Sequence, residues 1–411
     1  MRLLSTPAAA TAVIEAIFLR CTCKSQICMS RRWCMPQPLS LAQHTLFADL
    51  LEQGFEDLFD PDFPENGSFL VRERTSRAGV IRSYAYYQGY RSAAGRQDRG
   101  RRYSRYVGPT DDPAIGERIA RFKRIKAVRA ERSSTVDALV GAGMPRPRRA
   151  VGRMVEELAR AGLFPSRAVL IGAAAYQTYS GVLGVRLSKA LSAINDDGFS
   201  RTNQFAVYLK GPVPGGFSGL YGVAPSLAPA PGNKDDADAA SSQSKGQFHL
   251  GFLTAHHDGD GHPPELVATP ELLIAGRPAQ LLDFLTDQPV RSIVLHGPGI
   301  AVTVPSPERY TVHALIVHGQ QGTGVYDQVR TTSNLARATE LIEALDLVGR
   351  KHALERMFAE AWEREPNWRT HLLNSLSALP EAPGTILKAQ ATELRARLPV
   401  PPSSRPRTPS Q

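Results

Sequence analysis

The residues with the clearest potential for chemistry begin at a glycine that follows an apolar run. Val169–Ile171 has the length of a β-strand and ends at Gly172, and the small residue Ala173 opens a run with a helical pattern. A strand, a tight turn and a helix in this order place free backbone N–H groups and the positive end of the helix dipole at the turn. The segment therefore predicts a phosphate-binding turn at Gly172 and Ala173.

An acidic cluster follows the same predicted helix. Asn195, Asp196 and Asp197 are adjacent in the sequence, and carboxylate oxygens are ligands that Mg²⁺ prefers. A phosphate-binding turn combined with carboxylates favours metal-assisted nucleotidyl transfer, with a nucleoside triphosphate as ligand and Mg²⁺ at Asp196 and Asp197. We take all three residues of the cluster as candidate catalytic residues.

The composition indicates a globular protein with anionic partners. The chain has 411 residues, of which 42% are hydrophobic, and this is enough for a sizeable core and two or three domains. Lysine and arginine number 49 against 39 acidic residues, which gives a net charge of +10. The excess favours nucleotides, nucleic acid or an anionic membrane surface as partners, and the alternative is that it serves solubility alone.

Cysteine use and hydropathy indicate a cytoplasmic location. The four cysteines all precede residue 35, at Cys21, Cys23, Cys28 and Cys34. The rest of the chain has none, so we expect a core without disulfides, as is typical of the cytoplasm. No segment reaches about 18 uninterrupted apolar residues, and we therefore expect neither a transmembrane helix nor a membrane partner.

Changes in composition divide the chain into five regions. These are an untranslated or disordered extension (1–40), a basic region (41–148), an α/β core (149–320), a helical region (321–398) and a disordered tail (399–411). Within the core, residues 224–246 have almost nothing to bury and predict a disordered insertion. The loop His256–His262 has the residue types of metal ligands without their regular spacing.

Hydrophobic periodicity assigns the regular elements. Strands are predicted at 169–171, 205–209, 247–253, 292–295 and 300–304, and helices at 41–58, 115–130, 149–161, 173–179, 308–317, 334–347 and 354–376. Residues 67–109 contain short β-rich runs separated by glycine-containing turns, which predicts a β-meander.

Arginines and tyrosines are interleaved in residues 72–106 of this meander. Ten arginines between Arg72 and Arg105 stand among five tyrosines, with only Glu73 and Asp98 as acidic residues. Arginine forks onto phosphates and tyrosine stacks on bases, so residues 72–132, which include a basic helix, are a candidate nucleic-acid interface. The alternative is a solvated antiparallel sheet whose tyrosines pack on one face.

Several separated segments resemble one bacterial family with the nucleotidyltransferase fold. In chain order they are GSFLVRER, RYVGP, AGLFPSRAVLIGAAAYQTYSGVLGVRL, FHLGFLT, PAQLLDFL, VTVPSPERYTVHALIV and NLARATELIEAL. The family belongs to the DNA polymerase β-type superfamily, and the resemblance implies an α/β (α+β) fold with a mixed β-sheet core flanked by helices and a helical C-terminal part. It also implies nucleotidyl transfer from a nucleoside triphosphate at three acidic residues that hold two Mg²⁺ ions.

Two of the three acidic positions of that family are not acidic in this sequence. The family's T-x-D-x-D falls on residues 193–197, which puts Asn195 at the first carboxylate position and Asp197 at the second. Asp196 replaces Asn195 only if the register shifts by one residue, and the third carboxylate position is Gly251. Since asparagine brings no charge and glycine no side-chain ligand, the resemblance implies weakened or lost Mg²⁺ binding and catalysis, as in a pseudoenzyme.

Other positions of the family pattern are partly retained. Gly172 and Ala173 stand at its small-residue turn, whereas a lysine of the family is replaced by Ala314. Arg186 and Arg309 remain as candidate phosphate contacts, and the alternative for both is a surface salt bridge. The competing function is that of a non-catalytic module that binds a nucleotide, or nucleic acid through residues 72–106.

Overall fold

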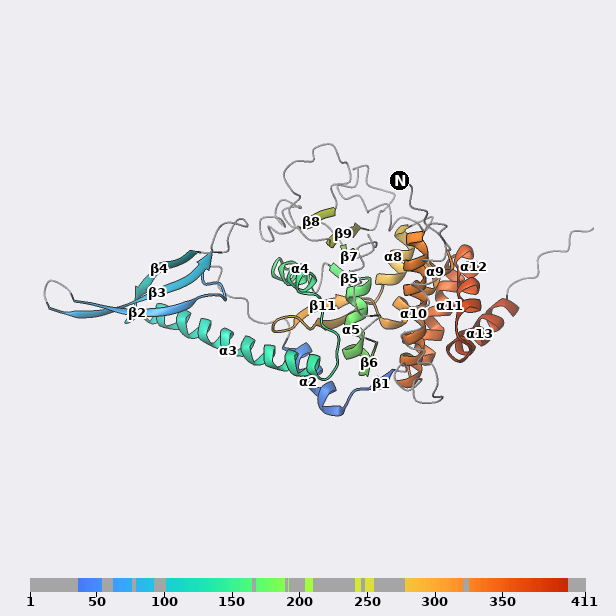
Figure 1. The fold of residues 1–411 in the computed structure, drawn as a ribbon, viewed down its shortest axis with the longest axis horizontal. Helices are drawn as coiled ribbons and strands as arrows, with labels where there is room; N and C mark the ends of the chain where they lie inside the picture. Colours follow the sequence, from blue (N-terminus) through green and yellow to red (C-terminus); the bar gives the residue numbers. More distant parts are fainter. Residues whose placement is uncertain are drawn as a thin grey trace, which may run out of the picture.

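The molecule is elongated, and its described residues form helices, two strand pairs and two larger sheets (Figure 1). The computed structural model describes residues 36–53, 62–75, 79–91, 101–164, 168–188, 191, 204–209, 241–244, 248–254, 278–320 and 325–397. One sheet is mixed and lies in the body with helices around it, and the other is antiparallel and lies at one end of the molecule. The predicted α+β class is confirmed.

The sheet at the end of the molecule and one long helix form an extension that we call the arm. Its elements are β2 (Ser68–Thr75), β3 (Ile81–Arg91), β4 (Arg101–Pro109) and α3 (Pro113–Gly141). The strands pair antiparallel in the order β2-β3-β4, as the predicted meander requires. Asp112 caps α3 by accepting a hydrogen bond from the Ala114 N–H at 2.9 Å, and Pro113 occupies the first turn.

Helix α3 connects the arm to the body because it packs on two hydrophobic clusters. Near its start, Phe122 lies under the sheet with Phe69 and Tyr87. Near its end, Val136 and Leu139 pack in a cluster with residues of α2 and of the strands β10 and β11. The bounds of these three elements are Leu41–Glu52, Val290–Val294 and Ile300–Val304. The helix extends beyond its predicted end at residue 130 because its second half has this additional surface to bury.

A buried arginine fixes α3 on the body. Arg132 donates hydrogen bonds to the carbonyl oxygens of Pro298 and Gln53 at 3.0 Å and of Gly299 at 3.1 Å. Burial lowers the pKa of its guanidinium. Since the carbonyls belong to the turn between β10 and β11 and to the end of α2, this one side chain joins three elements.

The mixed sheet of the body has the strand order β5-β7-β9-β8. Its strands are β5 (Ala168–Ile171), β7 (Gln204–Leu209), β9 (Phe248–Thr254) and β8 (Ser241–Ser244). β5 and β7 are antiparallel, β7 and β9 parallel, and β9 and β8 antiparallel. β8 lies inside the segment 224–246, for which the sequence predicts disorder; the pairing of β8 with β9 uses backbone groups and requires no apolar side chain.

Two helices and a small strand pair surround this sheet and the β10–β11 hairpin. The helices are α4 (Arg149–Arg160) and α5 (Ala173–Leu183), and the pair is β1 (Gln37–Pro38) with β6 (Val185–Arg186). Helix α4 has the predicted extent and buries its apolar stripe, which includes Val151, Val155 and Leu158.

Six helices form the C-terminal side of the body. They are α8 (Pro278–Thr286), α9 (Pro307–Gly319), α10 (Val325–Leu347), α11 (Lys351–Arg364), α12 (Pro366–Ala378) and α13 (Glu381–Ala396). The predicted helical run 354–376 is divided, because Pro366 opens α12 and holds Glu365 in an extended conformation. Trp362 and Trp368 are buried in the core that these helices share. None of the helices described has the length and hydropathy to span a membrane.

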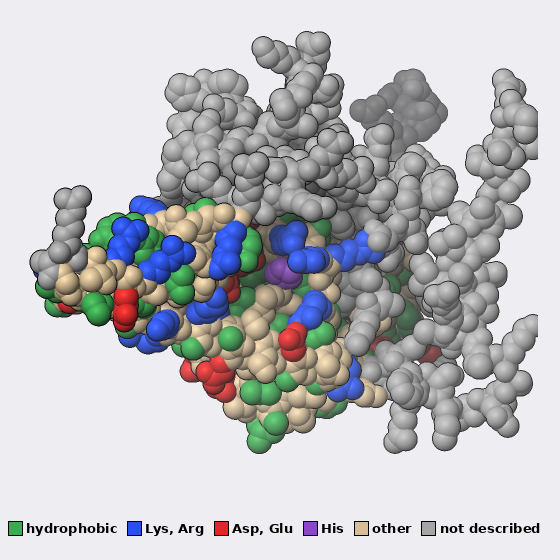
Figure 2. All heavy atoms as spheres, turned by 60° about the vertical axis from the view of Figure 1, so that its left-hand side comes forward, with side chains coloured by type: hydrophobic (Ala, Val, Ile, Leu, Met, Phe, Trp, Pro, Cys, Tyr) green, Lys and Arg blue, Asp and Glu red, His purple; other side chains and the backbone are tan. Residues whose placement is uncertain are grey.

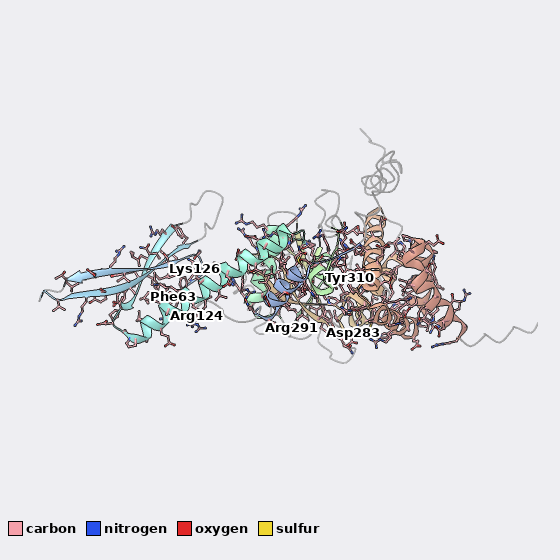
Figure 3. The ribbon with its side chains drawn as sticks, turned by 90° about the horizontal axis from the view of Figure 1, so that it is seen from below. Phe63, Arg124, Lys126, Asp283, Arg291 and Tyr310 are labelled. Carbon is pink, nitrogen blue, oxygen red and sulfur yellow. The ribbon has the colours of Figure 1, made fainter. Side chains whose placement is uncertain are left out.

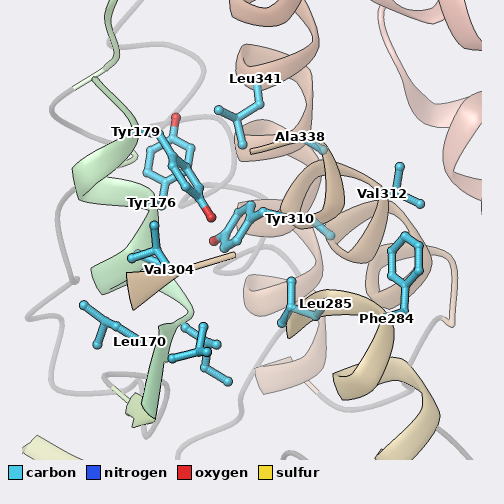
Figure 4. Close-up of a cluster of buried hydrophobic side chains, with 14 of the residues drawn as sticks. Leu170, Tyr176, Tyr179, Phe284, Leu285, Val304, Tyr310, Val312, Ala338 and Leu341 are labelled. Carbon is cyan, nitrogen blue, oxygen red and sulfur yellow. The ribbon is translucent and has the colours of Figure 1, made fainter. Parts of the chain in front are cut away.

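The main core lies between α5, the β-strands and the C-terminal helices (Figure 4). Tyr176 and Tyr179 of α5 contact Tyr310 of α9, with ring centroids 6.1 and 5.3 Å apart. The Tyr179 hydroxyl donates to the Pro305 carbonyl at 2.9 Å, so a polar atom deep in the core is satisfied. This packing holds α5 against the start of α9.

Candidate functional site

The turn between β5 and α5 has the geometry of an anion-binding helix start. Gly172 has φ 71° and ψ −150°, a backbone conformation that essentially only glycine adopts. Within the described residues no side chain caps the helix there, and Gly172 and Ala173 are both half-buried. The first N–H groups of α5 therefore keep the capacity to donate to an anion. The predicted order of strand, turn and helix is confirmed.

The strands beside this turn carry no carboxylate. Ile171 of β5 pairs with Ala206 of β7, and Ala206 pairs with Gly251 of β9. These residues form one row across the sheet, next to Gly172. The described strands of the sheet read AVLI, QFAVYL, FHLGFLT and SSQS, without an aspartate or glutamate.

The comparison with protein families agrees with this architecture. A nucleotidyltransferase family profile matches residues 149–363, which is more than half of the 411 residues. The chain belongs to this nucleotidyltransferase family. Searches of curated proteins and of solved structures found no match. The matched range begins at the first residue of α4 and ends within α11, so it includes the Gly172 turn and the mixed sheet.

The described residues of this nucleotidyltransferase chain do not fit a two-metal centre. Within the described ranges, no group of three His, Cys, Asp or Glu side chains is placed to hold a metal ion. The candidate catalytic residues Asn195, Asp196 and Asp197 lie outside those ranges, as do the four cysteines and the loop His256–His262. Because the row beside the turn continues from Gly251 only to Ser241 of β8, any acidic ligand has to come from outside the described strands.

Arg186 is not brought to the Gly172 turn. It stands in β6, after the C-terminal end of α5, whereas the turn is at the N-terminal end. A helix of 11 residues is about 16 Å long, which separates the two positions. The exposed Arg186 side chain lies instead over Gly143, where a Cβ would be 3.2 Å from its Nε. A contact between Arg186 and a phosphate bound at Gly172 is therefore not favoured.

Arg309 is a buried structural residue and not the surface salt bridge that we considered. Its side chain is 3% exposed and donates to both carboxylate oxygens of Glu360 at 2.9 and 3.0 Å. It also donates to Asp287 at 2.6 Å and to the Phe284 carbonyl at 3.1 Å. The guanidinium thus joins α9 to α8 and α11, and a phosphate would have to displace these acceptors. Ala314, at the lysine position of the family, is also buried.

A buried polar pair that the sequence analysis does not identify lies beside α5. Glu340 of α10 accepts hydrogen bonds from the Tyr176 hydroxyl and from the Ser188 N–H, the second at 2.6 Å. Arg337, on the same helix, donates to the Leu191 carbonyl at 3.1 Å and covers the Tyr176 ring at 5.6 Å. Glu340 therefore binds the backbone at Ser188, and Arg337 binds it at Leu191. Both positions lie shortly before Asn195 in the sequence.

The electrostatics of this pair follow from its burial. Burial raises the pKa of Glu340, although the hydrogen bonds from Tyr176 and Ser188 favour the ionised form. Burial, with the nearby Glu340 carboxylate, raises the pKa of Tyr176 well above its usual value. One signal was present in the sequence, because Glu340 interrupts an apolar helix face that includes Ala338 and Leu341. An acid on such a face requires a buried partner, but no spacing rule connects it with Tyr176.

Proposed function

We propose that the protein is a nucleotidyltransferase-fold protein that binds a nucleotide phosphate at the Gly172 turn but transfers nucleotidyl groups weakly or not at all. The observation that carries this proposal is the row of Ile171, Ala206 and Gly251, which has no acidic side chain beside the turn. The family membership supports nucleotidyl transfer as the reaction class. The missing carboxylates are the reason to expect that this transfer is slow.

Weak nucleotidyl transfer is expected because the positive charge of a metal pair needs compensation. Two Mg²⁺ ions bound beside a triphosphate require several carboxylates to hold them and to compensate their charge. Gly251 supplies none, Asn195 supplies only an amide oxygen, and Asp196 and Asp197 are the acids that remain in the family's motif. Phosphate binding at a helix N-terminus uses backbone N–H groups, so it does not depend on these acids.

Transfer is tested with the full chain and labelled ATP, GTP, CTP or UTP in Mg²⁺ or Mn²⁺, with the protein itself and RNA as acceptors. We expect incorporation near background, and any residual incorporation is lost in Asp197→Ala. Rapid incorporation that persists in Asp197→Ala would contradict both the weakened activity and the assignment of this site.

Nucleotide binding is tested separately by equilibrium dialysis with the same nucleotides. Gly172→Ala introduces a Cβ at a positive φ and distorts the N–H groups of the turn, so we expect nucleotide affinity to fall at least several-fold. Gly184→Ala is the matched control, because Gly184 also has a positive φ of 65° but ends the same helix. Equal losses of affinity in the two variants would show that the Gly172 turn is not the binding site.

A further inference from the structure

The arm carries a chemically distinct surface on the face of its sheet that is turned away from α3. Phe69 and Tyr87 point toward Phe122 of the helix, and both neighbours of Tyr86, Ala85 and Tyr87, are fully buried. Side chains alternate along a strand, so the residues between these inward ones project from the opposite side. We call this side the outer face and define it by Arg72, Arg74, Tyr84, Tyr86, Arg102 and Tyr106.

Strand register gathers the tyrosines of the outer face into one group. Tyr86 lies between Leu70 of β2 and Tyr106 of β4. The ring centroid of Tyr106 is 6.0 Å from that of Tyr84 and 5.6 Å from that of Tyr86. Tyr106 is 54% exposed, which is unusual for a side chain with so much apolar area to bury. The tyrosines of the sheet are therefore divided between its two faces, since Tyr87 faces the helix and this group does not.

The arginines of the outer face lie around these rings. The guanidinium carbons of Arg72 and Arg74 are 5.3 and 5.9 Å from the centroid of the Tyr86 ring. Arg102 donates a hydrogen bond to the side-chain oxygen of Gln88, an acceptor that carries no charge. No carboxylate stands at the alternating outer positions of the described strand residues. Figure 2 shows basic side chains interspersed with hydrophobic ones at this end of the molecule.

Several basic residues on the opposite side of the arm are used within the fold. Arg105 pairs with Asp62 at 2.8 Å, and Arg129 pairs with Glu65 at 2.9 Å. Lys126, which Figure 3 places along α3 near Phe63, donates to a backbone carbonyl at 2.8 Å. These three residues therefore hold the arm together, whereas Arg72 and Arg74 of the outer face lie against a tyrosine ring and are exposed.

We propose that the outer face binds single-stranded nucleic acid. Bases stack on Tyr84, Tyr86 and Tyr106, and the phosphates between them contact the surrounding arginines. A single strand is the form that fits, because exposed rings on a sheet need unstacked bases, and a duplex keeps its bases stacked inside. A duplex offers this face only its phosphates and loses the contribution of the rings.

The first test measures binding of the full chain to labelled single-stranded RNA and DNA oligonucleotides of mixed sequence, and to the matching duplexes, by fluorescence anisotropy. We expect a single strand to bind more tightly than its duplex, with a log–log salt slope of roughly −2 for three arginine contacts. Tighter binding of the duplexes, or no binding of either single strand at low salt, would overturn the proposal.

The second test separates stacking from charge on the tyrosine with the greatest exposure in the group. Tyr106→Leu keeps an apolar side chain but removes the ring, so we expect affinity to fall roughly tenfold. Tyr106→Phe keeps the ring and should retain the affinity of the unmodified protein. Because Tyr106 is exposed, thermal unfolding of both variants should stay close to that of the unmodified protein. Equal affinity of Tyr106→Leu and Tyr106→Phe would exclude stacking.

A charge-matched pair of variants locates the phosphate contacts. Arg72→Ala combined with Arg74→Ala should weaken binding and reduce the size of the salt slope by about 1.4. Arg395→Ala combined with Arg397→Ala removes the same charge from exposed positions at the end of α13 and should leave binding unchanged. An equal loss in both double variants would mean that net charge, and not the outer face, holds the nucleic acid.

Discussion

The two larger sheets among the described residues differ in which side chains they carry. The mixed sheet lies within the residues that the family profile matches, and every residue of its strand β5 is buried. The described strands of this sheet nevertheless contain no carboxylate. The arm sheet precedes that range and displays arginines and tyrosines on its outer face. A fold is maintained by its apolar residues, so a sheet can keep its structure without carrying catalytic side chains.

A glycine-to-alanine substitution should change stability far more in the tightly packed body than in the arm. In Gly319→Ala the new Cβ would lie 1.8 Å from the His371 carbonyl oxygen, where α9 meets α12. We expect this overpacking to lower the free energy of unfolding by about 3 kcal/mol, measured by urea denaturation. Gly116→Ala, in α3, meets no atom within 4 Å and should raise it by about 0.5 kcal/mol. Destabilisation of similar size at both positions would contradict the expected difference in packing between Gly319 and Gly116.

A smaller effect concerns the buried pair beside α5 and its dependence on pH. The pKa of Glu340 is raised in the folded protein, so the stability linked to its protonated form is fully present below the unfolded pKa. That stability is lost as pH rises through the folded pKa. Thermal unfolding should therefore show the unmodified protein losing stability relative to Glu340→Gln as pH rises, and a difference that does not change with pH would contradict this. Glu393→Gln, at an exposed position, controls for the loss of charge.

Much of the fold could be predicted from local patterns in the sequence. The apolar run before Gly172 and the helical pattern after it gave β5 and α5, because a strand needs only its own residues to be recognisable. The run 300–304 coincides with β11. The division at Pro366 could have been read from the proline itself, since proline disfavours a helical conformation in the residue before it.

The roles of individual side chains were harder to predict because they depend on distant partners. Arg309 bonds with Glu360, which is far along the chain, and nothing in the local sequence distinguishes it from a phosphate-binding arginine. Tyr87 and Tyr106 both stand in sequence rich in arginine and tyrosine, so the local sequence does not distinguish them. Strand register and the position of α3 place Tyr87 in the core and Tyr106 at the surface. The absence of a carboxylate at Gly251, in contrast, was visible in the sequence. The structure added only that Gly251 lies in the same row of the sheet as Ile171.

Restoring acidic residues at the two positions where the family has carboxylates should raise nucleotidyl transfer by this chain. Asn195→Asp combined with Gly251→Asp places carboxylates at the two positions that lack them, and Mg²⁺-dependent incorporation of labelled nucleotide is compared with that of the unmodified protein. We predict a measurable gain that disappears when Asp197→Ala is added. If the unmodified protein already incorporates nucleotide as fast as the restored variant, the account of a weakened centre is wrong.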